Sequence, residues 1–184
     1  PQVGCIGPKI LNSDGTLQLA SKGSFPHPMT AFFKLAGLNR IFPKSRLFGR
    51  YNLTYLDENK IFNVDALSGS FMLMPRQVFK VVGNFDESFF MYGEDLDYCY
   101  RIQKCGYDLV YNPEVSIIHY KGESVKSAPF DMVKIFYSAM HTFYQKHRND
   151  YPSWKFFKPF VFFSIYLHKI SSYFSNYVTR LTAW

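Results

Sequence analysis

The chain has 184 residues, enough for one domain or for one domain with an appendage. Hydrophobic residues make up 47% and charged residues 19%, a composition that excludes a disordered polypeptide and supplies a sizeable core. The net charge is +7, and most of the excess lies after residue 120, where nine basic residues accompany three acidic ones. Such a tail favours anionic partners such as lipid headgroups, although a merely solvated basic face would give the same count.

The first third of the chain predicts a strand followed by irregular backbone. Residues 2–11, QVGCIGPKIL, form an apolar run of strand type, NSDG follows as a turn, and TLQLAS alternates like a returning strand. Residues 24–60 contain several Pro and Gly residues among basic and aromatic ones, so we expect a long loop there that is functional or mobile. Because the chain opens directly on an apolar strand without a signal-like segment, we expect it to be the middle of a larger protein.

The middle of the chain alternates between predicted strands and helices. The run SFMLM at 70–74 fits a strand buried on both faces, and RQVFKVVG is a short helix closed by Gly83. A second helix runs from about Glu94 to Cys105 and ends at Gly106, before two strands, YDLVY and VSIIHY, around the turn NPE. This alternation predicts an α/β sheet.

From Pro129 onward the pattern becomes helical. Apolar residues at helical spacing through 132–143 predict an amphipathic helix, and those from 160 to 181 form a heptad stripe. The stripe fits packing against the protein or a second subunit in a homodimer as well as contact with a membrane interface. Trp154 and Lys155 at its start would suit the membrane. No run of 18 apolar residues is present, so we expect no segment that spans a bilayer.

Three carboxylates, Glu94, Asp95 and Asp97, crowd the start of the second helix, directly after the aromatic run FFMY and Gly93. Acidic side chains in a first turn complement the helix dipole by about 0.3–1 kcal/mol each, and one or two would suffice. Three of them behind a water-excluding aromatic run favour a functional site, where a carboxylate accepts a proton or binds a cation or hydroxyl groups. His119 ends a predicted strand before a Gly-containing loop and is a candidate metal ligand.

Residues 64–124 resemble the second half of the catalytic domain of family 2 glycosyltransferases, in particular the rhamnosyltransferase-like enzymes of bacterial surface polysaccharide synthesis. The resemblance rests on five elements in order: an SG strand, GNFDESFF, YGEDLDYCYR, GY, and a terminal His before a Gly-containing loop. It extends from about Val3 to Ser124, weakens through 24–60, and is loose after residue 130.

The resemblance implies an α/β protein that forms the acceptor-side half of a GT-A fold with a mixed sheet. We expect this half at residues 1–128 and a tail of amphipathic helices at 129–184. The implied activity is an inverting transfer of a sugar from a nucleotide-diphosphate donor to a hydroxyl of a saccharide or lipid-linked saccharide acceptor. We expect the enzyme in the cytoplasm, peripheral to the inner face of the membrane.

The resemblance also implies roles for individual residues. Asp95 is the general base that takes the acceptor proton, Glu94 helps to hold the acceptor, and His119 is a ligand of Mg²⁺ or Mn²⁺. Four further residues are expected to bind the acceptor: Asp97, Ser68, Gly69 and Tyr92. Three residues in the loop after the strand are candidates for phosphate contact: Lys121, Gly122 and Ser124.

Two departures from the family pattern matter. The sequence has no Asp-x-Asp motif before residue 90, so we expect the donor pocket and the remaining metal ligands upstream and the isolated chain to be inactive. Ala66 also stands where the subgroup often has Trp, which puts an aromatic platform at that position in doubt.

Two other classes of protein remain open, and a third is disfavoured. A metal-dependent hydrolase would need a fuller ligand set, such as a second His or an Asp-x-Asp motif. A nucleic-acid-binding module would suit the net charge and the many aromatics, but the charge lies in a helical tail and no such motif is present, so we expect no nucleic acid partner. A non-enzymatic membrane or oligomerisation module fits the tail but leaves the acidic cluster unexplained.

Overall fold

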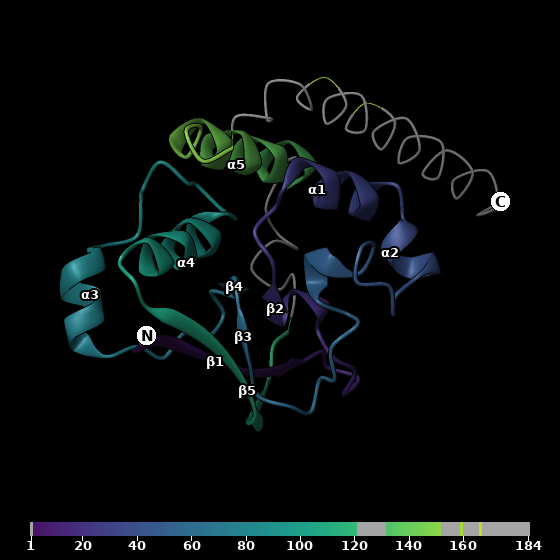
Figure 1. Cartoon of the computed structure of the whole chain (residues 1–184), viewed down its shortest axis with the longest axis horizontal. Helices are drawn as coiled ribbons and strands as arrows, with labels where there is room; N and C mark the ends of the chain where they lie inside the picture. Colours follow the sequence, from purple (N-terminus) through teal and green to yellow (C-terminus); the bar gives the residue numbers. More distant parts are fainter. Residues whose placement is uncertain (1, 121–131, 152–158, 160–165, 167–184) are drawn as a thin grey trace, which may run out of the picture.

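The computed structural model describes residues 2–120, 132–151, 159 and 166. Strands and helices alternate along the chain, which confirms an α/β architecture (Figure 1). The strands are β1 (Val3–Leu11), β2 (Lys22–Gly23), β3 (Phe62–Val64), β4 (Ala66–Leu67) and β5 (Asp108–Ile118). The helices are α1 (Pro28–Leu35), α2 (Leu38–Ile41), α3 (Arg76–Val82), α4 (Glu94–Lys104) and α5 (Met132–Lys146), with short 3₁₀ helices η1 (Leu19–Ser21) and η2 (Arg50–Asn52).

A mixed sheet in the order β1–β5–β3 forms the centre, with β1 parallel and β3 antiparallel to β5. β2 and β4 form a separate antiparallel pair. Pro8 of β1 pairs with Asn112, whereas the next residue, Lys9, pairs with Ser116, so β5 bulges between these partners. Pro113 lies in the bulge, where its missing N–H costs no ladder hydrogen bond. The two strands predicted around NPE are therefore one bulged strand.

Two other predicted strands are wrong. Within 70–74 only Leu73 makes a bridge, to Ile6 of β1, and its side chain is 59% exposed, so the run is not buried on both faces. A turn closed by a hydrogen bond from the Phe71 N–H to the Ser68 C=O comes before Leu73, and Pro75 comes after it, directly before α3. Too few residues lie between them to form a ladder of strand hydrogen bonds. The run TLQLAS makes one bridge to the end of β1 and then turns into η1.

α3, α4 and α5 confirm the helices predicted within 76–146. Gly83 after α3 and Gly106 after α4 have φ values of 82° and 85°, as expected for glycines that end helices. The segment predicted as irregular, 24–60, instead contains α1, α2 and η2. Pro28 is the first residue of α1, a position where proline favours a helix. In the sequence the same proline favoured irregular backbone.

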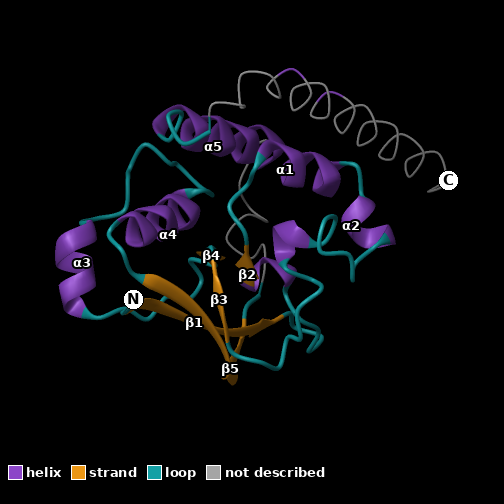
Figure 2. Ribbon diagram, viewed as in Figure 1, coloured by secondary structure: helices purple, strands orange, loops and turns teal. Residues whose placement is uncertain are grey.

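The core crosses the predicted domain boundary at 128/129. Phe143, Tyr144 and Tyr151 are at most 5% exposed and belong to the same buried cluster as Tyr98 of α4 and Leu109 of β5. Figure 2 shows α4 between α5 and the strands. α5 is therefore part of this core and not a separate appendage. The predicted heptad stripe at 160–181 lies outside the described residues. Among the described helices, none combines the length and the apolar character needed to cross a membrane.

Candidate active site

The chain turns sharply just before α4. Tyr92 and Gly93 both have positive φ, 67° and 82°, a region of backbone conformation that is unfavourable for a residue other than glycine. A Cβ atom on Gly93 would lie 3.1 Å from the ring of Phe89 and 3.2 Å from the Cβ of Ala139. The turn is thus packed between the aromatic run and α5. After this turn, α4 packs against β4.

Asp95 is held at this helix start by backbone N–H groups. Its Oδ2 accepts a hydrogen bond from the Gly69 N–H at 2.9 Å, and its Oδ1 accepts one from the Leu96 N–H at 2.8 Å. Burial raises the pKa of Asp95, and these hydrogen bonds oppose the rise without cancelling it. A carboxylate that is fixed in position and more basic than usual is suited to accept a proton.

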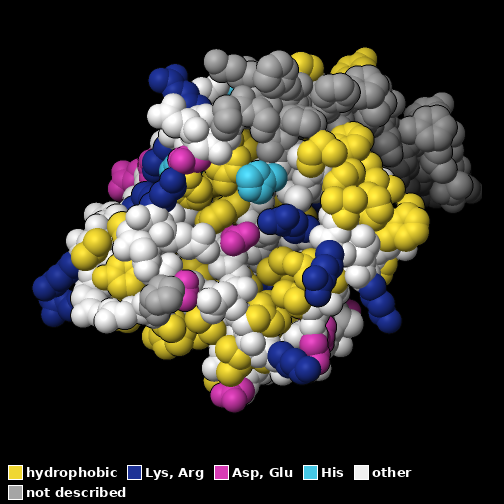
Figure 3. All heavy atoms as spheres, viewed as in Figure 1, with side chains coloured by type: hydrophobic (Ala, Val, Ile, Leu, Met, Phe, Trp, Pro, Cys, Tyr) yellow, Lys and Arg dark blue, Asp and Glu magenta, His cyan; other side chains and the backbone are white. Residues whose placement is uncertain are grey.

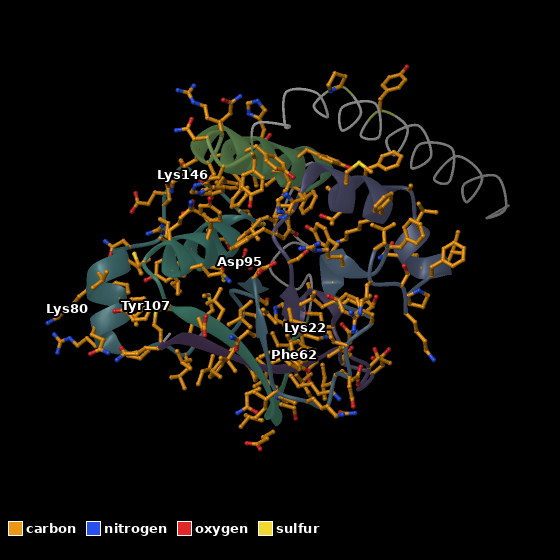
Figure 4. The ribbon with its side chains drawn as sticks, viewed as in Figure 1. Lys22, Phe62, Lys80, Asp95, Tyr107 and Lys146 are labelled. Carbon is orange, nitrogen blue, oxygen red and sulfur yellow. The ribbon has the colours of Figure 1, made fainter. Side chains whose placement is uncertain are left out.

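Asp95 lines a pocket of about 190 Å³. Figure 4 shows Asp95 at the end of α4 that lies beside the β2–β4 pair. The predicted residue Tyr92 also lines this pocket, next to Gly93 of the same turn. Phe136 and Met140 from α5 add apolar surface. The other lining residues come from η1, β2, α1, η2, β4, α4 and the segments beside them: Ala20, Lys22, Gly23, Ser24, Lys34, Tyr51, Asn52, Ala66, Leu67 and Leu96.

Three polar lining residues, Tyr51, Lys34 and Lys22, were not singled out from the sequence. Burial, with the negative charge of Asp95, raises the pKa of Tyr51 to about 12. The Nζ of Lys34 lies 3.7 Å from the centre of the Tyr51 ring. Lys22 is 2% exposed, and burial lowers its pKa. The pocket thus combines a carboxylate, the Tyr51 ring and the Lys34 ammonium group over that ring, a set that suits a ligand with many hydroxyls or with negative charge. The Lys22 ammonium group lies instead 5.0 Å from the centre of the Tyr111 ring, and Tyr111 does not line the pocket.

Glu94 adjoins Asp95 but does not line the pocket. Its Oε2 atom is buried without a hydrogen-bond partner in the described part of the chain. Burial raises the pKa of Glu94, and the charge of Asp95 adds to that effect. The expected acceptor contact of Glu94 stays a prediction, which this unpartnered oxygen makes chemically reasonable.

Asp97 has different surroundings from the other two acids. Its side chain is fully buried and accepts bonds from Nε of Arg101 at 2.8 Å and from Nζ of Lys146 at 2.9 Å, while Nε2 of His147 lies 2.8 Å away. Burial alone would raise the pKa of Asp97, but the hydrogen bonds from these three side chains outweigh it and lower the pKa. Since no carboxylate oxygen is open to a ligand, we assign Asp97 to the attachment of α5 to α4 instead of to acceptor binding.

The turn at Ser68 and Gly69 contributes to the site mainly by supporting Asp95. Besides the Gly69 N–H bond, a Cβ atom at position 69 would lie 3.1 Å from the Cβ of Asp95, so the two residues are in close contact. The Oγ of Ser68 lies 2.8 Å from the Oγ of Ser70. Neither Ser68 nor Gly69 lines the pocket, and their contact with an acceptor stays a prediction.

His119 directly follows β5, and its Nδ1 lies 2.9 Å from the Oε1 of Gln18. This contact leaves Nε2 as the ring nitrogen for a metal. In the described ranges there is no group of three His, Cys, Asp or Glu side chains that could hold a metal ion, so these residues alone do not form a metal site. The predicted phosphate-contact residues lie outside the described residues: Lys121, Gly122 and Ser124.

Comparison of the chain with known proteins indicates its family. Residues 44–133 match the family model described as "Glycosyltransferase like family 2". Residues 44–133 thus form a region of the glycosyltransferase family 2 type, and the chain as a whole is similar to enzymes of that family. This similarity implies a GT-A fold, with which the mixed α/β sheet agrees.

Within the family the chain is rhamnosyltransferase-like. It is 33% identical, over 129 residues and 70% of its length, to the N-acetylglucosaminyl-diphospho-decaprenol L-rhamnosyltransferase of Mycobacterium tuberculosis. It is 40% identical over 72 residues, 38% of the chain, to rhamnosyltransferase WbbL of Escherichia coli, 27% of which is covered. It is 31% identical over 114 residues, 62% of the chain, to the low-salt glycan biosynthesis hexosyltransferase Agl10 of Haloferax volcanii, 32% of which is covered. The match to the mycobacterial enzyme covers 41% of that protein's length.

Proposed function

We propose that this chain is the acceptor-side part of an inverting glycosyltransferase, in which Asp95 takes the proton of the acceptor hydroxyl. The observation that carries this proposal is the placement of Asp95: it lines a pocket, two backbone N–H groups fix its carboxylate, and burial raises its pKa. A general base positioned in this way accelerates proton transfer by typically about 10²–10⁴-fold.

The substrates follow from the pocket and from the relatives. A nucleotide-diphosphate sugar is the proposed donor, and the names of two relatives favour a rhamnosyl group. The proposed acceptor is a saccharide or a saccharide linked to a lipid diphosphate, as in the name of the mycobacterial relative. Lys34 in the pocket suits a substrate that carries negative charge. We place the enzyme at the cytoplasmic face of the membrane, with a dimer through the tail as a further proposal.

The divalent ion that this family generally uses is Mg²⁺ or Mn²⁺ in our proposal. Such an ion would neutralise charge on the departing diphosphate. His119 is the one ligand that we propose from this chain, and the others would come from upstream strands.

Sugar transfer provides the test of this function. The enzyme that carries this chain would be incubated with labelled nucleotide-diphosphate sugars, a rhamnosyl donor among them, and with lipid-linked and soluble saccharide acceptors. We expect transfer to an acceptor hydroxyl with inversion at the anomeric carbon, read by NMR of the product. Donor hydrolysis without transfer, or retention at the anomeric carbon, would contradict the proposal.

A further inference from the structure

α1, α2 and the turns that follow them present apolar side chains to solvent. The exposed fractions are 66% for Ile41, 50% for Phe42, 57% for Leu47 and 37% for Phe32. We call this surface, residues 29–50, the α1–α2 platform. Figure 3 shows hydrophobic side chains gathered at this end of the molecule, with Lys and Arg side chains beside them. Apolar residues that gather in this way on a basic surface usually mark an interaction site.

The charge of the platform is of one sign. Between Asp14 and Asp57 the sequence contains no acidic residue. The same stretch contains six basic residues: Lys22, Lys34, Arg40, Lys44, Arg46 and Arg50. The last four are exposed, and none of them forms an ion pair within the described part of the chain. Their positive charge is therefore not neutralised by neighbouring carboxylates.

The platform is held together by its own aromatic rings and by bonds to the rest of the fold. The Phe48 ring packs against those of Phe33 and Phe42, with centres 5.0 and 5.5 Å apart. The Oγ1 of Thr54 donates to the Pro43 C=O at 2.6 Å, which fixes the turn after α2. The exposed side chains thus stand on a preorganised surface, so binding through them orders little additional backbone.

We propose that the α1–α2 platform is a docking surface for an anionic lipid bilayer. Aromatic and aliphatic side chains such as Phe42 and Ile41 would enter the headgroup region, while Arg40, Lys44 and Arg46 contact lipid phosphates. Each basic residue near such a surface strengthens binding by about fivefold. A bilayer with anionic headgroups fits both properties at once, because it offers a negative surface above an apolar interior.

The platform adjoins the pocket of Asp95. Lys34 of α1, which is part of the platform, lines that pocket, and so does Tyr51 of η2, the residue directly after the platform. Docking would therefore hold the pocket close to the bilayer surface, where a lipid-linked saccharide is presented. This last step rests on the proposed function, whereas the docking itself does not.

Vesicle flotation of the full chain tests the docking. The wild type should bind vesicles of phosphatidylcholine with phosphatidylglycerol, bind phosphatidylcholine alone much more weakly, and lose binding as salt is raised. Replacing Arg40, Lys44 and Arg46 together with Gln should weaken binding on the order of 100-fold. Ile41→Ser with Phe42→Ser should also weaken it. The matched control is Lys80→Gln with Val81→Ser on α3, which removes an exposed basic and an exposed apolar residue elsewhere and should bind like the wild type.

The rival contact is the basic tail, represented by Lys155, Lys158 and Lys169. Unchanged binding by the platform variants, with loss on replacing those three lysines with Gln, would overturn the proposal. Hydrogen exchange of the wild type adds a measurement without substitutions: vesicles should protect amides within residues 29–48 and leave those of α3 unchanged. No protection in that range would equally overturn it. Since neither readout requires sugar transfer, a failure here is distinct from a failure of the proposed activity.

Discussion

Asp95 and Asp97 lie two residues apart on α4, and their carboxylates have opposite electrostatic surroundings. Residues at positions i and i+2 of a helix do not share a face. Asp95 lines the pocket and accepts backbone N–H bonds, whereas Asp97 is fully buried beside Arg101, Lys146 and His147. The pKa of Asp95 is therefore raised by burial, and that of Asp97 is lowered by its partners in spite of burial. We propose that the Asp95 carboxylate serves proton transfer, whereas the Asp97 carboxylate binds side chains of α5 and the residue after it.

The role of Asp97 predicts a loss of stability on substitution. Asp97→Asn leaves three basic side chains without their shared carboxylate, and we expect the free energy of unfolding to fall by about 3 kcal/mol, measured by urea denaturation. The control is Asp150→Asn, which breaks the exposed pair with Lys104 and should lower stability far less, because solvent screens that pair. Equal losses in the two variants would contradict the attachment role of Asp97.

The contribution of the Asp97 carboxylate to stability should also depend on pH in the acid range. Because the pKa of Asp97 is lower in the folded than in the unfolded chain, its contribution to stability is complete above the ordinary Asp pKa of about 3.9. It is lost as the pH falls through the lowered value. Unfolding measured across this acid range should show a smaller fall in stability for Asp97→Asn than for the wild type.

Activity should depend on pH through Asp95. A general base must be deprotonated to act, and the pKa of Asp95 is raised. As the pH is lowered, kcat should therefore begin to fall while the pH is still above the ordinary Asp pKa of about 3.9. Transfer rates across the acid range, at saturating donor and acceptor, provide the measurement. An acid limb at or below the ordinary value would show that burial does not govern the reacting carboxylate.

Gly69 should matter through the position of Asp95. In Gly69→Ala the added Cβ would lie 3.1 Å from the Cβ of Asp95, closer than ordinary contact, so the carboxylate must shift. We expect kcat to fall by about tenfold, since small misplacements of a reacting group are costly. Ser70→Ala, on the same turn, should retain near-normal kcat. If both variants keep the wild-type kcat, the Gly69 contact has no role in positioning the base.

The parts of the structure that local sequence determines were predictable. The helix from Glu94 followed from its acidic first turn and its closing Gly106. The functional site that its clustered acids indicate stays a prediction. The apolar run at 70–74 was misleading, because a continuous apolar sequence does not show whether a neighbouring strand covers it. Pro28 was misleading for a related reason, since proline ends most helices but begins some.

The pocket itself depends on contacts between distant parts of the chain. Tyr51 and Lys34 meet Asp95 only after residues 28–52 fold against α4 and α5, and no local pattern reports that meeting. The sequence did contain one signal of the basic surface: the stretch between Asp14 and Asp57 has no acidic residue. The net charge of residues 1–120 does not show this, because it is close to zero. A charge count in shorter windows would have indicated the basic surface of the α1–α2 platform.

Metal binding by this chain alone should be weak. His119 is the one ligand we propose here, and a single imidazole is a poor site for Mg²⁺, which prefers oxygen ligands. Calorimetric titration of the 184-residue chain with Mg²⁺ and Mn²⁺ should show no tight binding, with no difference for His119→Ala. Micromolar affinity for Mg²⁺ in the wild-type chain would mean that a complete site exists within it, contrary to our proposal.

The most direct test of the account is the kcat of Asp95→Asn in the enzyme that carries this chain, with nucleotide affinity measured in parallel. Asn keeps the shape of the side chain and an oxygen for the Gly69 N–H, but it cannot take a proton at neutral pH. We predict that kcat falls by at least about 10²-fold while the dissociation constant for the nucleotide stays near the wild-type value. A kcat close to that of the wild type would remove Asp95 from the role of general base and transfer the question to Glu94.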